Sequence, residues 1–72
     1  MPKLPRVSGQ EIQRALERLG FQRVRQRGSH VVLRKGELGC VIPLHDEVAV
    51  GTLRSILRQA GISPDDFGSA LK

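Results

Sequence analysis

The apolar residues of this 72-residue chain change period twice, from about 3.6 to about 2 and back again. The first helical stretch begins at Ser8, which has capping-box spacing to Glu11, and ends at Gly20, a residue suited to a left-handed C-terminal position. Phe21 is placed to fold back onto the last turn. An amphipathic helix is therefore expected between Ser8 and Gly20, with its apolar face formed by Ile12, Ala15, Leu16 and Leu19.

From residue 21 the alternation becomes that of strands. It predicts a strand over 21–27, a tight connection at Gly28-Ser29 and a second strand over 30–35. Residues 36–39 are expected to form another turn. A third strand should hold Cys40, Val41, Ile42 and Leu44, with Pro43 at a sheet edge or at the strand's end.

Helical spacing returns near Gly51-Thr52 and stops at Gly61, and Ser63-Pro64 then supplies an N-cap and a first-turn proline for a short helix toward Leu71. The fold expected from this order is an α+β, two-layer α-β-β-β-α domain. Two helices should cover one face of a three-stranded antiparallel sheet and leave its other face open to solvent. We expect a single domain over residues 1–72, with residues 1–7 as an extended lead-in.

The composition narrows the classes of partner. A net charge of +5 and a pI near 10.7 favour a polyanion, and first of all nucleic acid, although surplus arginine can also serve only to solvate a surface. One cysteine cannot form an internal disulfide or a zinc cluster. Neither a membrane-length apolar run nor a signal peptide is found, so a cytoplasmic protein without membrane contact or cofactor is expected.

Arginine recurs at every second position of the first strand. Simple alternation places Arg23, Arg25 and Arg27 on one face, where their guanidinium groups could bind successive phosphates. The alternative is a solvated face whose charges prevent aggregation between sheet edges. The chain has no Trp or Tyr, and both Phe residues are expected to be buried. Domains that bind single-stranded nucleic acid by stacking its bases on aromatic side chains are therefore disfavoured. Binding through the RNA backbone is not.

His30 is the leading candidate for chemistry, because imidazole can give or take a proton near neutral pH. It follows the small residues Gly28 and Ser29, which would let an RNA backbone approach, and alternation puts it on the side of Val32 and Arg34. An ordinary surface histidine is the alternative. A Cys40–His45 pair is not expected because Cys40 belongs to an apolar strand. The run from His45 to Glu47 lacks the spacing of a metal site and is interpreted as a solvated turn.

Several strings in order resemble the HicA (YcfA-like) mRNA interferase family. They are Leu19-Gly20-Phe21, Arg25-Gln26-Arg27-Gly28-Ser29-His30, Val41-Ile42-Pro43-Leu44-His45, Gly51-Thr52-Leu53-Arg54-Ser55-Ile56-Leu57 and Ala60-Gly61-Ile62. The resemblance implies a fold like that of a double-stranded-RNA-binding domain and an mRNA-cleaving toxin that uses no metal and no cofactor. It also implies a HicB-type antitoxin that covers the catalytic face, and it aligns His30 with the family's catalytic histidine. Many members carry a second histidine next to it, where this chain has Val31.

The expected function is thus that of an endoribonuclease. RNA supplies its own nucleophile in the 2′-hydroxyl, so His30 would act as general base or acid, and Arg34 with one or more of Arg23, Arg25 and Arg27 would stabilise the transition state. Ser29 is expected to contact RNA together with these arginines. The second proton-transfer group is left unassigned. A non-catalytic binder of structured RNA and a protein-interaction module are the alternatives.

Overall fold

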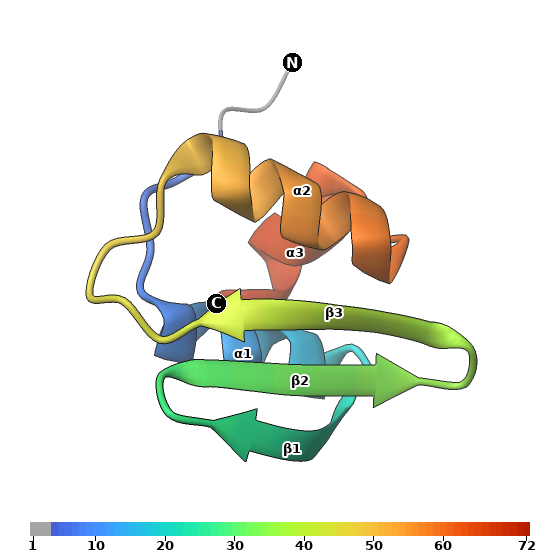
Figure 1. Cartoon of the computed structure of the whole chain (residues 1–72). Coiled ribbons are helices and arrows are strands. Elements are labelled where there is room, and N and C mark those ends of the chain that lie inside the picture. The colour runs from blue at the N-terminus through green and yellow to red at the C-terminus, as the bar shows by residue number, and fades with distance from the viewer. Residues whose placement is uncertain (1–3) are drawn as a thin grey trace.

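The computed structural model describes residues 4–72 and confirms the α+β class (Figure 1). Of the lead-in expected over residues 1–7, residues 1–3 lie outside the described part, and Val7 forms an isolated bridge with Val48. A third helix follows the α-β-β-β-α order, as the Ser63-Pro64 signal predicts. The elements are α1 (Gly9–Arg18), β1 (Gln22–Arg27), β2 (His30–Lys35), β3 (Leu38–Pro43), α2 (Val50–Ala60) and α3 (Pro64–Ala70).

The boundaries of α1 are made by the local signals in its sequence. The Ser8 hydroxyl accepts a hydrogen bond from the Glu11 amide at 3.1 Å, and the Glu11 carboxylate accepts one from the Ser8 amide at 3.0 Å. At the other end, Gly20 has φ +101°, and the Phe21 amide donates to the Leu16 carbonyl at 3.0 Å. The first two bonds satisfy amides at the start of the helix, and the third satisfies the Leu16 carbonyl at its end. Both predicted ends of this helix are thereby confirmed.

The sheet has the order β1-β2-β3, with all pairs antiparallel. The second turn is shorter than expected: only Gly36 and Glu37 connect β2 to β3, since Lys35 already pairs with Leu38. The third strand therefore begins at Leu38 and ends at Pro43. The expectation that Leu44 belongs to it was wrong by one residue, although the Leu44 amide still donates to the Ser29 carbonyl at 2.6 Å.

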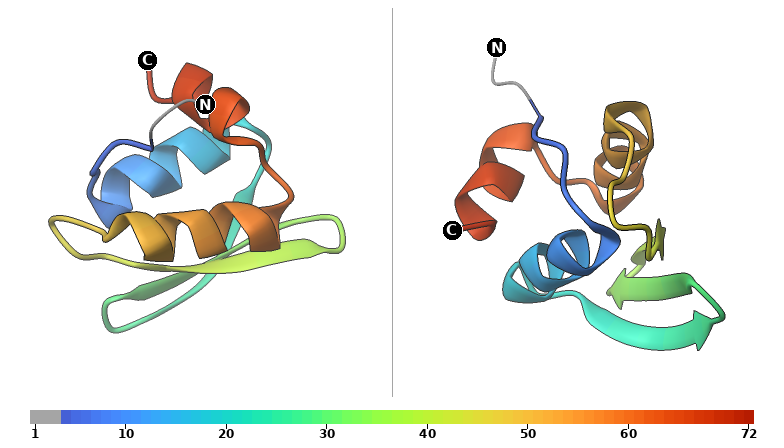
Figure 2. Two further views of the ribbon diagram at one scale, coloured as in Figure 1. Left: turned by 90° about the horizontal axis from the view of Figure 1, so that it is seen from above. Right: turned by 90° about the vertical axis from the view of Figure 1, so that its left-hand side faces the viewer.

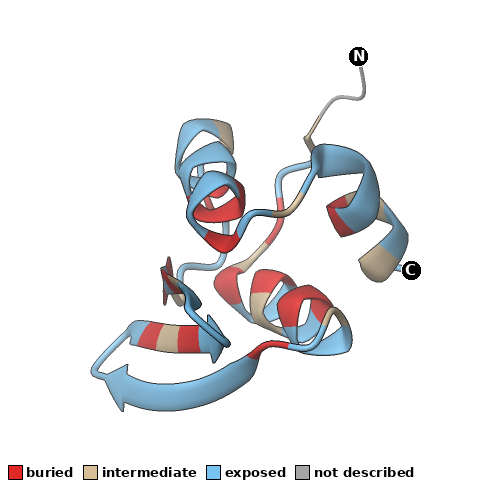
Figure 3. Cartoon of the chain, turned by 90° about the vertical axis from the view of Figure 1, so that its right-hand side faces the viewer, coloured by how far each residue is buried: buried red, intermediate tan, exposed pale blue. Residues whose placement is uncertain are grey.

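Helices α1 and α2 lie on the same face of the sheet, and α3 packs against α1 away from the sheet (Figure 2). The inward side chains of β2 and β3 are buried beneath the helices, whereas every residue of β1 is exposed (Figure 3). Within residues 4–72, no helix lies over the opposite face of the sheet, as predicted. The largest fully buried side chains are Phe67, Ile12, Leu16, Leu33, Ile42, Leu53, Val31 and Val48.

Candidate functional site

His30 is the first residue of the central strand and is exposed. It follows a two-residue turn in which Gly28 has φ +55° while Ser29 has no positive φ, the pattern of a type II′ hairpin turn. A Cβ added at Gly28 would meet no atom within 4 Å. The backbone before His30 is thus open to a large ligand, as the small residues of the turn predict.

The neighbours of His30 across the sheet are Arg27 on β1 and Pro43 on β3. The Leu44 amide donates to the Ser29 carbonyl at 2.6 Å, one step beyond this pair. Hydrogen-bonded and non-hydrogen-bonded pairs alternate along an antiparallel ladder, so His30 and Pro43 form a non-hydrogen-bonded pair, in which the side chains lie closest. His30 therefore lies on the open face between Arg27 on one neighbouring strand and Pro43 on the other.

The arginines of β1 do not share one face, contrary to the expectation from simple alternation. The register pairs Arg23 with Leu33 but Arg25 with Val32, so one extra residue, Val24, forms a β-bulge between them. Because Leu33 points toward the helices and Val32 away from them, Arg23 lies on the opposite side of the sheet from Arg25. The expectation of a continuous three-arginine stripe was therefore wrong.

Further contacts agree with this register. The Arg23 guanidinium donates to the Gln26 side-chain carbonyl at 3.0 Å, and the register pairs Gln26 with Val31 on the helix-facing side. Arg25 and Arg27 are left on the open face. Only these two of the three arginines are on the same side as His30.

Arg34 is on the open face, as alternation predicts, but at its far end. It pairs with Gly39, and a Cβ added to Gly39 would lie 3.6 Å from the Arg34 Cγ, so the arginine side chain lies across the glycine. Arg34 lies four positions after His30 along the strand, about 13 Å at about 3.3 Å per residue. Arg27 is thus the cation next to His30, in place of the expected Arg34.

The open face is positively charged and contains no carboxylate. Its members are Gln22, Arg25, Arg27, His30, Val32, Arg34, Gly39, Val41 and Pro43. Between residues 22 and 43 the one acidic residue is Glu37, which lies in the turn between β2 and β3. Val41 is 46% exposed at the centre of this face. The arrangement is a flat cationic surface with an apolar middle and one imidazole at its edge.

Comparison with known proteins gives one family. A family model described as the HicA toxin of bacterial toxin-antitoxin systems matches residues 9–62, most of the chain. The chain belongs to the HicA toxin family. No curated protein matches this sequence. The region that matches the HicA model runs from the first residue of α1 past the end of α2, so it contains the whole sheet and the turn before His30. The resemblance inferred from the sequence is confirmed at the level of the family.

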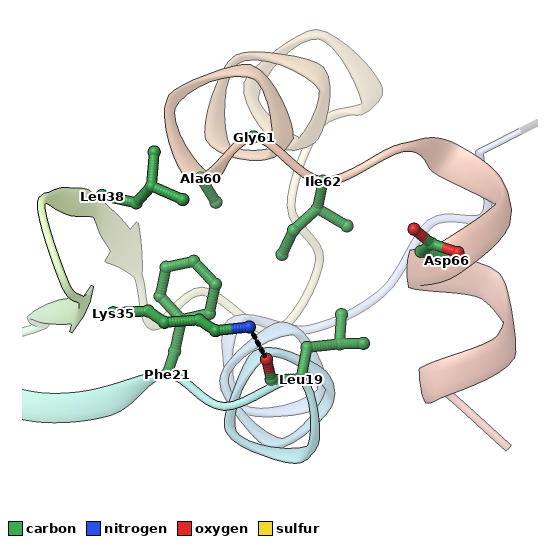
Figure 4. Close-up of a pocket in the computed structure, with 8 residues that line it drawn as sticks. All are labelled: Leu19, Phe21, Lys35, Leu38, Ala60, Gly61, Ile62 and Asp66. Carbon is green, nitrogen blue, oxygen red and sulfur yellow. Dashed lines mark hydrogen bonds between the residues drawn. The ribbon is translucent and has the colours of Figure 1, made fainter.

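The other side of this HicA domain carries a small hollow that is not part of the site (Figure 4). Its lining is mostly apolar, with Phe21 and Ile62 among the lining residues. The Lys35 ammonium points across it and donates to the Leu19 carbonyl at 2.8 Å, so it completes the C-terminus of α1. None of the predicted site residues lines this hollow, which we interpret as a packing feature.

Cys40 is buried, as expected of a residue in an apolar strand. Burial raises the pKa of its thiol from 9.0 to about 11, which leaves it unreactive near neutral pH. Within residues 4–72, no cluster of three or more His, Cys, Asp or Glu side chains could hold a metal ion. No helix of the described chain is long and apolar enough to span a membrane.

Residues 45–47 are exposed, as expected of a solvated turn, but the start of this segment lies against α1. The Gly9 amide donates to the His45 carbonyl at 2.9 Å, and a Cβ on Gly9 would lie 2.7 Å from the Leu44 Cα. The N-terminus of α1 is therefore packed directly on residues 43–45. Sequence reasoning missed this contact, and the only local signal for it is a glycine at the first position of a well-capped helix.

Proposed function

We propose that this HicA-family toxin is an endoribonuclease that cleaves mRNA without a metal ion, and that His30 is its catalytic residue. The observation that carries the proposal is the position of His30: exposed, next to Arg27, and at the edge of a cationic face without carboxylates. A phosphodiester can approach such a face without repulsion. The 2′-hydroxyl of the RNA supplies the nucleophile, so the protein needs only to move protons and to stabilise charge.

The arginines take different parts in this proposal. Arg27 is close enough to His30 to face the same phosphate and would stabilise its transition-state charge, since directly opposed residues have Cβ atoms about 5 Å apart. Arg25 and Arg34 would bind neighbouring phosphates along the face, and Ser29 would contact the backbone at the turn. Arg23, on the other side of the sheet, would contribute only to the general positive field.

The decisive experiment is RNA cleavage in the presence of EDTA, with wild type and His30→Ala. Wild type should cut RNA to products with a 2′,3′-cyclic phosphate, and a 2′-deoxy substitution at the scissile nucleotide should block the cut. His30→Ala should lose about 10²–10⁴-fold in rate. If neither protein cleaves while both bind RNA, the chain is instead a non-catalytic RNA-binding protein. Cleavage that requires a divalent metal would refute the proposed chemistry.

The β-bulge provides a matched pair of variants for the RNA-binding surface. Arg27→Ala should reduce the slope of log affinity against log salt by about 0.7–0.9 for each phosphate that the arginine neutralises in the wild-type complex. Arg23→Ala removes the same charge from the same strand but from the other face, and it should change the slope less. Equal effects of the two variants would show that the open face is not where RNA binds.

A toxin-antitoxin family member has an antitoxin partner, and we propose that it is a HicB-type protein that covers the open face. An adjacent co-transcribed reading frame should encode it, and its product should relieve growth arrest caused by this chain. The complex should hide His30 from diethyl pyrocarbonate. If His30 stays fully reactive in a stable complex, the antitoxin binds elsewhere.

A further inference from the structure

Cleavage of RNA by its own 2′-hydroxyl needs two proton transfers, and His30 accounts for one. A base must take the proton of the 2′-hydroxyl, and an acid must give a proton to the departing 5′-oxygen. The chain has two histidines, His30 and His45. The residue that makes the second proton transfer can be sought only if the proposed function holds, because a protein that does not cleave RNA needs neither the base nor the acid.

Two hydrogen bonds indicate that the backbone continues in an extended form past the end of β3. The Leu44 amide bonds toward β2 through the Ser29 carbonyl at 2.6 Å, whereas the His45 carbonyl bonds the opposite way, to the Gly9 amide at 2.9 Å. Such alternation of hydrogen-bonding direction from one residue to the next is that of a strand. His45 therefore continues the line of β3 for two residues beyond Pro43.

Side chains also alternate along an extended segment, which determines the side that His45 takes. The Leu44 side chain is half-buried and packs against the core, on the helix side of the sheet. Its neighbours Pro43 and His45 must then face the other way, toward the open face. His45 is exposed, as this requires. It thus shares a face with His30.

The register places the two histidines as diagonal neighbours. His30 pairs with Pro43, and His45 follows two residues later, a relation that separates Cα atoms by about 7–8 Å and the Cβ atoms by somewhat less. Two imidazoles at that separation can both reach one phosphate group between them. The intervening Gly28-Ser29 turn leaves open space, since a Cβ at Gly28 would meet nothing within 4 Å.

The charged groups around the two rings differ. Arg27 and Arg25 on β1 share the open face with His30. The two residues after His45 are the carboxylates Asp46 and Glu47, and the Glu47 carboxylate is paired with the Arg6 guanidinium at 3.0 Å. With His30 as the acceptor of the 2′-hydroxyl proton, the second transfer falls to His45.

We propose that His45 is a second catalytic residue, the general acid of RNA cleavage. His30 takes the proton of the 2′-hydroxyl as the bond from O2′ to phosphorus forms. His45 gives its proton to O5′ as the bond from phosphorus to O5′ breaks. The products are a 2′,3′-cyclic phosphate and a 5′-hydroxyl, His30 is left protonated and His45 neutral, and exchange with water restores both.

The test uses a substrate that does not need an acid. In an RNA oligonucleotide with sulfur in place of the bridging 5′-oxygen, the leaving thiolate departs without a proton. On ordinary RNA, His45→Ala and His45→Gln should each lose about 10²–10⁴-fold in rate. On the sulfur substrate, His45→Ala should come within about tenfold of wild type, the size of effect expected once proton donation is bypassed. His30→Ala should stay inactive on both.

The controls separate this inference from the proposed function. Because His45 is exposed, its variants should melt with wild type, and Gln59→Ala, an exposed change on α2, should keep full activity. If wild type cleaves neither substrate, the proposed function fails. If wild type is active but His45→Ala is equally fast on ordinary RNA, or is equally impaired on both substrates, His45 is not the general acid and the inference alone is overturned.

Discussion

Replacing Gly9 with alanine should destabilise the protein, although the sequence alone predicts the opposite. Gly9 is the first residue of α1, where alanine is the better helix former by about 0.5–1 kcal/mol. In the folded protein, however, the added Cβ would collide with the carbonyl oxygen of Pro43 and lie 2.7 Å from the Leu44 Cα. Both are backbone atoms, so no rotamer change relieves the contact.

The size of the effect follows from these opposing terms. Overpacking of a well-packed site costs about 1–3 kcal/mol, and a collision with backbone belongs at the upper end. After subtraction of the helix-propensity gain, the loss is about 2 kcal/mol out of the roughly 4–11 kcal/mol expected for 72 residues. For a domain of this size, that corresponds to a fall in Tm of about 10 °C.

The assay is urea unfolding followed by circular dichroism, with Gly51→Ala as the matched control. Gly51 is the second residue of α2, and a Cβ there would meet no atom within 4 Å, so this variant should be as stable as wild type or slightly more stable. Gly9→Ala should also lose RNA cleavage, because the segment that carries His45 is displaced. If Gly9→Ala and Gly51→Ala raise the unfolding midpoint equally, the close approach of α1 to residues 43–45 is wrong.

Three other properties can be checked in solution. Hydrogen bonds from Ser8 hold the pKa of Glu11 below 4.5. The stability that this carboxylate contributes is therefore present above its unfolded pKa and is lost as pH falls through the lower folded pKa. Glu11→Gln should make the free energy of unfolding depend less on pH in this acidic range. Burial raises the pKa of Cys40 to about 11, so stability should decline as pH rises above 9.0, and iodoacetamide should label this thiol at pH 8 only after unfolding. Ile42→Ala, at a side chain with 0% exposure, should cost about 2–5 kcal/mol by urea titration, and a loss below 1 kcal/mol would contradict the packing.

Local chemistry made much of the fold predictable from the sequence. The capping box at Ser8, the left-handed Gly20 and the type II′ turn at Gly28 each involve hydrogen bonds or dihedral angles within a few residues. Such features do not depend on what the rest of the chain does. The alternation in β2 likewise assigned its faces correctly, because one face had to be buried beneath the helices.

The site was predictable only in part, because it depends on pairing between strands. His30 and the open face could be found from the sequence, but the bulge at Val24 could not, since an extra residue in an exposed edge strand leaves no trace in a polar alternating pattern. The bulge moved Arg23 to the far side. The register also made Arg27, and not Arg34, the neighbour of His30.

The sequence by itself determined the order of helices and strands, the two hairpin turns, the buried stripes and the family. The tertiary structure decided which residues lie together: Gly9 against Leu44, and Arg27 across the sheet from His30. The physical reason is the range of the forces involved. Caps and turns are completed by atoms close in the chain, whereas a site is completed by residues that only the packing of one segment on another brings together.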